Sequence, residues 1–328
     1  MQGGLGRIAG PGGRAAAGEP RPRLLRQAAV SLPPRKVTVI VNRGGGSFGE
    51  DKAEQLESLF EVRGIAARVL AVEPGELDRH CVEAAAEKGV DALVAAGGDG
   101  TISTAAGAAA GSGMPLGVLP LGTLNHFARD AGIPLDLEQA VAAIAYGKTR
   151  RVDIAEVNGR VFINNSAVGL YPQLVREREA QQRHLGRSKR LAMASAALRT
   201  LWRFRHHRLV LKVAGRKEPV ETPLLFIGNN RYETGLLGLG KREAIDRGEL
   251  CVYAPLARSA LQFFSISLRA VLGRPDEQED FLTLDVDAVE IGSSRARLMV
   301  ATDGEAQPLE TPLRYRIRPG ALTVFVPE

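Results

Sequence analysis

The chain has 328 residues, of which 45% are hydrophobic and 24% are charged. This balance is typical of a globular protein, and it excludes a collagen-like, mucin-like or wholly disordered chain. At about 150 residues per domain the length predicts two domains or one large one. No apolar run approaches the roughly 18 residues that cross a membrane. The two cysteines, Cys81 and Cys251, are expected to be free thiols in a reducing cytoplasm.

The net charge of +6 is unevenly distributed along the chain. Residues 1–34 contain five arginines and one glutamate, and residues 176–208 contain ten basic and two acidic side chains. The remainder therefore carries a net charge of −6. Two basic segments on a mildly acidic body favour a polyanionic partner, such as phosphate, nucleic acid or an anionic membrane.

Residues 1–34 contain seven glycines and five prolines and show no apolar period, so we expect a disordered tail. No apolar core follows its arginines, which argues against a secretory signal. A transit peptide and a translation start placed too far upstream are the alternatives.

From residue 35 to residue 149, short apolar runs alternate with helical patterns. Strands are expected at 37–41, 67–72, 91–96 and 116–120, and helices at 50–63, 76–89, 101–110, from about 125 and at 136–146. Near-continuous apolar strands separated by helices predict an α/β domain with a parallel sheet covered on both faces. Ligands of such sheets bind beyond the carboxyl ends of the strands.

Residues 150–328 are expected to form a second, β-rich domain. Short strands between turn residues are expected at 151–157, 160–168, 208–215, 224–230, 249–255, 281–292, 296–304, 313–320 and 321–327. Their density predicts an antiparallel sandwich or barrel. A helical stretch at about 173–204 interrupts them, and a return of the last strand to the first domain is left open.

The segment from Gly97 to Thr101 (GGDGT) follows an apolar strand and precedes a helix. Glycines at such a turn let the backbone approach a phosphate closely, and the amide groups at the start of the helix point at the anion. Because Asp99 repels phosphate, we expect it to act through a magnesium ion or a hydroxyl group. A plain strand-to-helix turn is the alternative.

Two further loops follow predicted strands. The loop NRGGGS, which begins at Asn42, lies where a phosphate cradle is expected, and Arg43 adds a charge-assisted contact. Neither the Walker pattern nor the dinucleotide fingerprint is present. In PLGTLNHFARD, at residues 120–130, Thr123 and Asn125 either cap the next helix or present a hydroxyl and an amide group to the same crevice.

A fourth loop, ATDGE, occupies residues 301–305 at the end of a strand in the second domain. A D-G pair between strands is a common hairpin turn, and this is one interpretation. In the other, Asp303 and Glu305 lie near the interdomain cleft, where a carboxylate accepts the proton of an attacking hydroxyl group.

Taken together, GGDGT, PLGTLNHFAR and TDGE, in this order and at these separations, resemble the diacylglycerol kinase catalytic-domain family. This family includes bacterial lipid kinases, ceramide kinases and sphingosine kinases, and the resemblance covers roughly residues 36–328. GGDGT also occurs in NAD kinases and, as a close variant, in phosphofructokinases, whereas the PxGTxN segment favours the lipid kinases.

The resemblance implies a nucleotide-binding α/β domain like that of NAD and diacylglycerol kinases, followed by a β-sandwich. It implies that residues 97–101 and Thr123 contact ATP, that residues 42–47 match the phosphate loop of the family, and that the D-G-E carboxylates supply the general base. Between Asp303 and Glu305 we favour Glu305.

Three positions depart from the family pattern. Arg43 replaces a proline, and His126 stands where an aspartate is usual. Arg247 falls where many members have an acidic residue that helps to hold a structural magnesium ion. This last departure puts a metal site in the second domain in doubt, whereas magnesium carried with the nucleotide, and contacted through Asp99, is unaffected.

The predicted site therefore combines two sets of residues. The nucleotide set is Asn42, Arg43, Gly44, Gly45, Gly46, Gly97, Gly98, Asp99, Gly100, Thr101, Thr123 and Asn125, and the catalytic set is Asp303 and Glu305.

Within the basic segment 176–208, Leu191, Ala194, Leu198 and Trp202 are spaced by three and four residues and form one apolar helical face. Flanking arginines make this pattern typical of a helix on an anionic membrane surface. A helix packed on its own domain is the alternative. Nucleic acid is a poorer partner, because no nucleic-acid-binding motif is present.

We therefore expect an ATP- and Mg²⁺-dependent lipid kinase that phosphorylates a hydroxyl group of diacylglycerol or a related lipid, in the cytoplasm and peripherally on a membrane. The alternatives are an NAD kinase-like enzyme with a soluble substrate, and an inactive regulator that binds nucleotide or membrane. The sequence leaves the lipid and the oligomeric state open, a homodimer being one option.

Overall fold

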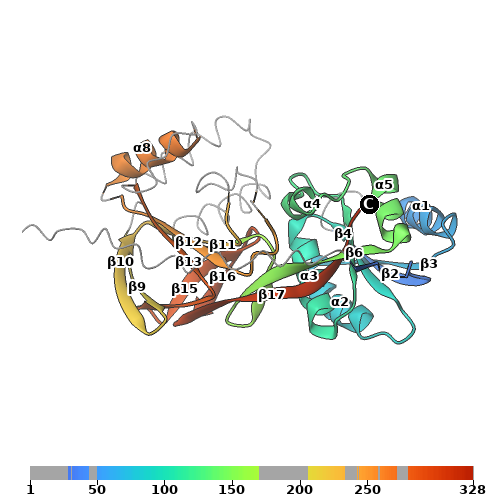
Figure 1. Cartoon of the computed structure of the whole chain (residues 1–328), viewed down its shortest axis with the longest axis horizontal. Helices are drawn as coiled ribbons and strands as arrows, with labels where there is room; N and C mark the ends of the chain where they lie inside the picture. The colour runs from blue at the N-terminus through green and yellow to red at the C-terminus, as the bar shows by residue number, and fades with distance from the viewer. Residues whose placement is uncertain are drawn as a thin grey trace, which may run out of the picture.

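The structure is a computed structural model, and it describes residues 29–30, 32–43, 50–169, 206–232, 242, 244–257, 259–271 and 280–327. It consists of a parallel-sheet α/β unit and a β-sandwich unit, which lie at opposite ends of the chain's long axis (Figure 1). The predicted helix at 173–204 lies outside the described residues. Among the described residues, no helix is long and apolar enough to cross a bilayer.

Four parallel strands form the centre of the α/β unit, in the order β5-β4-β2-β3. They are β2 (Lys36–Asn42), β3 (Ala66–Val72), β4 (Ala92–Gly97) and β5 (Leu116–Pro120). Every residue of β4 and β5 is buried, as expected for strands covered on both faces. The carboxyl ends of β2, β4 and β5 therefore lie side by side, and the loops that follow them share one edge of the sheet.

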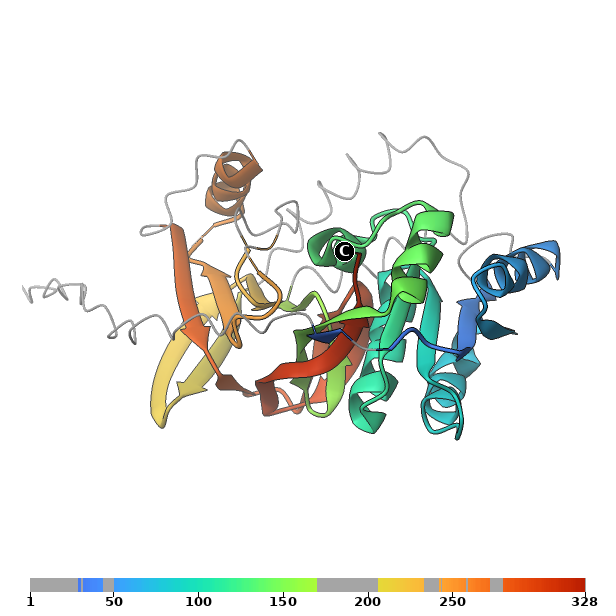
Figure 2. The same cartoon turned by 45° about the vertical axis from the view of Figure 1, so that its right-hand side comes forward.

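Helices cover both faces of this sheet (Figures 1 and 2). The helices are α1 (Glu50–Glu61), α2 (Leu77–Ala85), α3 (Asp99–Ser112), α4 (His126–Ala131) and α5 (Leu137–Tyr146), with a short 3-10 turn, η2 (Pro74–Glu76), before α2. α2 packs against α3 on one face, and α1 packs against α5 on the other. Their inner sides and the strands bury one apolar core, which includes Ile40, Phe60, Leu93, Ile102 and Phe127.

The sandwich unit is built from antiparallel strands in two layers. One layer is a six-stranded sheet in the order β13-β12-β11-β8-β15-β16, with β8 (Asn165–Gly169), β11 (Leu224–Asn229), β12 (Leu250–Pro255), β13 (Phe281–Val286), β15 (Arg297–Thr302) and β16 (Glu305–Glu310). The other layer contains β9 (His207–Val213), β10 (Arg216–Thr222), β14 (Ala288–Ser293) and β17 (Leu313–Phe325). Apolar side chains of both layers, among them Leu211, Ile227, Val252, Ile291 and Val300, form a second core. The predicted fold class, a parallel-sheet domain with an antiparallel sandwich, is thus confirmed. Above the six-stranded sheet, α8 (Ala260–Val271) packs on a third, smaller apolar cluster.

Two long strands connect the units. β6 (Lys148–Val157) pairs antiparallel with β17, and β17 continues until Val324 pairs in parallel with Leu116 of β5. The predicted domain boundary at 149/150 falls within β6. A short strand, β7 (Arg160–Phe162), folds back on β6 and carries the chain toward the sandwich.

Several sequence expectations need correction in detail. Residues 29–30, expected to be disordered, form β1 (Ala29–Val30), which pairs with Lys148 and Thr149 of β6. The run at 281–292, expected to be one strand, forms β13 and β14 in different layers. The two strands expected at 313–327 form the single strand β17, with a register shift between Arg318 and Leu322. The run at 160–168 is split into β7 and β8 by residues 163–164.

Candidate active site

The GGDGT segment joins β4 to α3, and a close contact requires glycine at position 97. A Cβ atom on Gly97 would lie 2.5 Å from the hydroxyl oxygen of Thr101, which is itself buried. The Nδ2 atom of Asn42, at the end of the neighbouring strand β2, donates a hydrogen bond of 3.0 Å to that hydroxyl group. The first turn of α3 is therefore tied to the adjacent strand end, which places its first amide groups at the carboxyl ends of β2 and β4.

The loop after β5 touches the GGDGT segment backbone to backbone. A Cβ atom on Gly122 would lie 2.6 Å from the Cα atom of Gly98 and 2.7 Å from Oδ1 of Asn125. Asn125 shapes this loop: its Oδ1 accepts from the amide of Gly122 at 3.0 Å, and its Nδ2 donates to the carbonyl of Gly122 at 2.8 Å. Its φ of 50° lies in the left-handed region that Asn tolerates better than most residues. The two loops form one continuous surface.

Asp99 connects these two loops. Its carboxylate accepts hydrogen bonds from the backbone amides of His126, at 3.1 Å, and Phe127, at 3.0 Å. These are the first amide groups of α4, which otherwise lack intrahelical partners. Asp99 also accepts a hydrogen bond of 3.3 Å from the side-chain amide of Asn164. The carboxylate expected to serve a magnesium ion therefore also caps α4.

Of the other residues predicted to bind the nucleotide, the structure describes two and leaves three outside the described ranges. Thr123 is exposed at the tip of the loop after β5. Arg43 is half-exposed and lies 3.7 Å from the carboxylate of Glu73. Gly44, Gly45 and Gly46 lie outside the described residues.

The TDGE segment forms a two-residue hairpin turn between β15 and β16. Asp303 and Gly304 have φ values of 47° and 87°, and Thr302 pairs with Glu305, as expected for a D-G turn of this length. The Asp303 carboxylate accepts three backbone hydrogen bonds, from Ile163 at 2.8 Å, Asn164 at 2.9 Å and Asn165 at 3.0 Å. Asp303 therefore fixes the turn against the start of β8.

Asp303 also faces the α/β unit. Burial raises the pKa of its carboxyl group, and hydrogen bonds from Ser103 and from the amides of residues 163–165 oppose this effect. Ser103 belongs to α3, so this contact crosses between the units. The TDGE turn of the sandwich and helix α3 of the α/β unit thus meet directly.

Glu305 lies at the point where the two units meet. A Cβ atom on Gly100 would lie 3.0 Å from its Oε1 atom, which places the carboxylate against the first turn of α3. Its Oε2 atom accepts a hydrogen bond of 2.8 Å from Arg160, whose Nε donates to Thr302 at 2.9 Å. The side chain of Glu305 is 58% exposed, so it remains accessible to a substrate.

Two family models match the chain. The "Diacylglycerol kinase catalytic domain" matches residues 36–157, and the "YegS C-terminal NAD kinase beta sandwich-like domain" matches residues 173–326. The chain belongs to the diacylglycerol kinase catalytic-domain family, among the YegS-like lipid kinases. The predicted family is thereby confirmed.

Relatives support this membership along most of the chain. A Pseudomonas aeruginosa PAO1 protein named "Probable lipid kinase YegS-like" is 34% identical over 289 residues, covering 84% of this chain and 90% of its own length. A protein of the same name from Pseudomonas fluorescens Pf-5 is 32% identical over 285 residues, covering 84% and 91%. A crystal structure described as a diacylglycerol kinase from Bacillus anthracis Sterne shares the fold, with a TM-score of 0.66 at 20% identity over 90% of this chain and 98% of that one.

Arg247 stands where the family resemblance places an acidic residue, and the residues around it form hydrogen bonds and an ion pair within the protein. The amide of Arg247 donates to Oδ1 of Asn230 at 3.0 Å, and the neighbouring Asp246 pairs with Arg150 at 2.6 Å. Asp153 accepts hydrogen bonds from the amides of Gly248 and Gly320 at 2.6 and 2.7 Å. Within the described ranges, no three His, Cys, Asp or Glu side chains are grouped to share a metal ion.

The site of this kinase family member also contains residues that sequence reasoning missed. Arg160 pairs with Glu305, and Asn164 contacts Asp99 with its side chain and Asp303 with its backbone amide. Arg242 in turn contacts the side chain of Asn164. One signal was present: two consecutive asparagines interrupt the apolar run at 160–168, where asparagine is unfavourable in a strand.

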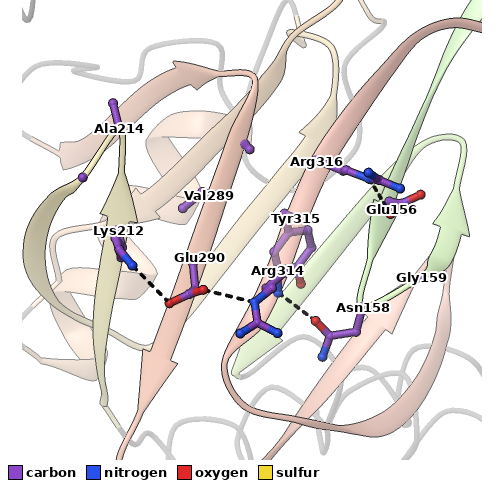
Figure 3. A pocket seen from close by; sticks show the side chains of 12 residues that line it. Glu156, Asn158, Gly159, Lys212, Ala214, Val289, Glu290, Arg314, Tyr315 and Arg316 are labelled. Carbon is purple, nitrogen blue, oxygen red and sulfur yellow. Dashed lines mark hydrogen bonds and ion pairs between the residues drawn. The ribbon is translucent and has the colours of Figure 1, made fainter.

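A separate groove of about 720 Å³ lies on the solvent side of β9, β14 and β17 (Figure 3). None of the predicted site residues lines it. Its exposed cations are paired with carboxylates, Arg314 with Glu290 at 3.1 Å and Arg316 with Glu156 at 2.6 Å. The charges of the groove largely neutralise one another, so it is a surface depression distinct from the site described above.

Proposed function

We propose that this chain is an ATP-dependent kinase that transfers the γ-phosphate of ATP to a hydroxyl group of diacylglycerol or a related lipid. One observation carries the proposal: the Glu305 carboxylate lies against Gly100 in the first turn of α3. A base that is held beside an anion-binding helix terminus is the arrangement that phosphoryl transfer requires, because the reaction depends on positioning and charge neutralisation.

Glu305 is the proposed general base. The two oxygens of Asp303 already accept three backbone amides, and this carboxylate holds the turn in place. Glu305 is exposed and its Oε1 atom faces Gly100. It would accept the proton of the lipid hydroxyl group as that oxygen attacks the γ-phosphorus and the bond to the β-phosphate oxygen breaks, releasing ADP.

The loops after β4 and β5 are the proposed nucleotide site. Backbone amides of the α3 terminus, with glycines at 97, 98, 100 and 122, leave room for phosphates to approach the main chain closely. Thr123 and Asn42 border this surface, and Arg43 is the proposed charged contact. Magnesium bound with ATP would neutralise phosphate charge. Asp99 is the carboxylate of these loops that would contact it, through the lone-pair position that its three hydrogen bonds leave free.

The location of the lipid site and the contact with a membrane are also proposals. The sandwich is the proposed location of the acyl-chain contacts, and residues 176–208 are the proposed contact with an anionic membrane surface, which would place the enzyme at the cytoplasmic face of a membrane. The sequence alone carries this part, since most of that segment lies outside the described residues.

An ATP-dependent phosphorylation assay tests the proposal. The purified chain is given γ-labelled ATP, Mg²⁺ and either diacylglycerol in mixed micelles, a total lipid extract, or NAD. Labelled lipid from the wild type, lost in Glu305→Gln and retained in Glu310→Gln, is the expected result. Labelled product from NAD alone would replace the lipid substrate with a soluble one. ATP binding without turnover on any lipid would indicate a regulator.

A further inference from the structure

Arg242 is a buried charge that the proposed reaction does not use. The side chain is completely buried, and its Nε atom lies 2.6 Å from Oδ2 of Asp130 in α4. One terminal nitrogen donates to the carbonyl of Ile163 at 2.6 Å and to that of Asn229 at 3.3 Å. A guanidinium group keeps its charge in proteins, so it is tolerated here because each of these contacts compensates for lost water.

The remaining terminal nitrogen of Arg242 sets the orientation of Asn164. It donates to Oδ1 of Asn164 at 3.1 Å, and a guanidinium group has no acceptor, so the oxygen end of the amide must face it. The NH₂ end then faces Oδ1 of Asp99, at 3.3 Å. Without Arg242, only the Asp99 carboxylate, which accepts hydrogen bonds but does not donate them, would orient this amide.

Asn164 lies between the two acidic segments of the site. Its side chain reaches Asp99 in the GGDGT segment, while its backbone amide donates to Asp303 in the TDGE turn at 2.9 Å. Its carbonyl accepts a hydrogen bond of 3.1 Å from the hydroxyl group of Tyr232. One residue therefore bridges the α/β unit and the sandwich at the point where the proposed phosphate donor and base must be aligned.

Arg242 is linked to both ends of the short helix α4, directly at its end and through Asn164 and Asp99 at its start. Asp130, near its end, pairs with Arg242 directly, and the amides at its start are held by Asp99, which Asn164 contacts. We propose that Arg242 is a positioning residue: through Asp130 and Asn164 it holds Asp99, α4 and the TDGE turn in one fixed relation. Only the kinetic test of this inference rests on the proposed kinase function.

Removing Arg242 alone would leave Asp130, whose side chain is only 9% exposed, without its charged partner, so a second variant is needed to separate positioning from stability. Arg242→Gln is expected to lower Tm by roughly 10 °C. In the double variant Asp130→Asn with Arg242→Gln, both charges are gone and the two amides can bond each other, so Tm should recover. The shorter amide side chain at position 242 cannot hold both residue 130 and Asn164 as the arginine does.

The kinetic readout is the split between kcat and KM for ATP, measured well below Tm on diacylglycerol micelles. The double variant should keep a KM for ATP within about threefold of the wild type and lose at least about tenfold in kcat, because small misplacements of reacting groups are costly. Arg269→Gln breaks an ion pair with Asp280 in which the arginine is 45% exposed and which lies away from Asp99 and the TDGE turn, so it should leave kcat unchanged. Wild-type kcat in the double variant would overturn the proposal.

Hydrogen exchange supplies a readout that is independent of activity. The amides of residues 126, 127 and 163–165 are protected by Asp99 and Asp303. Both groups should exchange faster in the double variant and at the wild-type rate in Arg269→Gln. If the wild type phosphorylates no substrate, the proposed function fails, but the exchange rates still decide the role of Arg242. Unchanged protection of both groups of amides in the double variant would refute the positioning role of Arg242.

Discussion

The Oε2 atom of Glu305 lies 2.8 Å from a guanidinium nitrogen of Arg160, and each residue directly follows a two-residue turn with positive φ angles. Asn158 and Gly159 precede Arg160, and Asp303 and Gly304 precede Glu305. Tight hairpin turns fix the direction of the strands that follow them. The two turns therefore set the backbone positions of both residues, and the ion pair holds the Glu305 carboxylate beside α3.

Glu305→Gln should abolish phosphoryl transfer without affecting folding. The amide keeps the size of the side chain but cannot accept the proton, so activity should fall at least about a hundredfold. Because the side chain is exposed, the free energy of unfolding should change by less than about 0.5 kcal/mol. Glu310→Gln, on the same strand and paired with Arg297 at 3.0 Å, is the matched control. Comparable activity in the two variants would remove Glu305 from the proposed role.

Gly122→Ala should separate the two loops that are proposed to bind the nucleotide. The new methyl group would meet the Cα atom of Gly98 and Oδ1 of Asn125 at under 3 Å, so one loop must shift, at a cost of about 1–3 kcal/mol. We expect weaker ATP binding by titration calorimetry and a lower Tm. In Gly111→Ala, within α3, the added atom meets nothing within 4 Å, and stability should rise by roughly 0.5–1 kcal/mol. Full ATP affinity in Gly122→Ala would contradict the site.

Asp99 should have separable structural and functional effects. Asp99→Ala removes the acceptor for the amides of His126 and Phe127, and the loss of such a cap costs about 1 kcal/mol. Asp99→Asn retains one acceptor oxygen, so it should be the more stable variant in urea unfolding while its charge is gone. If the charge serves magnesium, both variants lose kinase activity. If kinase activity in the two variants falls only as much as their stability does, the role of Asp99 is limited to capping α4.

Local chemistry explains why much of the site could be predicted from the sequence. The glycine turn at 97–101 and the D-G turn at 303–304 are dictated by nearby residues, and both lie where they were expected. Long-range contacts could not be predicted in this way. Asn164 contacts Asp99 across 65 positions and Arg242 across 78, and no local pattern marks either pair.

In the fold as well, local elements could be predicted from the sequence, whereas long-range strand pairing could not. Strand and helix positions in the α/β unit follow the apolar pattern closely. The run at 281–292 alternates on both sides of Asp287, with apolar residues at 282, 284 and 286 and then, one position out of phase, at 289 and 291, and its halves join different sheets. Alternation indicates which face of a strand is buried, and it carries no information about which sheet the strand joins. Pairing of β17 with β5 likewise depends on tertiary packing.

The two thiols should be inert in the folded protein. Cys81 and Cys251 are both buried and free. Burial raises the pKa of Cys81 to about 12, with a smaller effect from Asp78, and burial also raises the pKa of Cys251. The thiolate is the reactive form, so at pH 8 only about one Cys81 side chain in ten thousand would be ionised even without steric protection. A colorimetric thiol reagent should therefore detect no cysteine in the native chain and two after denaturation. Cys81→Ser and Cys251→Ser variants assign any signal, and rapid reaction of either thiol in the native state would contradict its burial in the core.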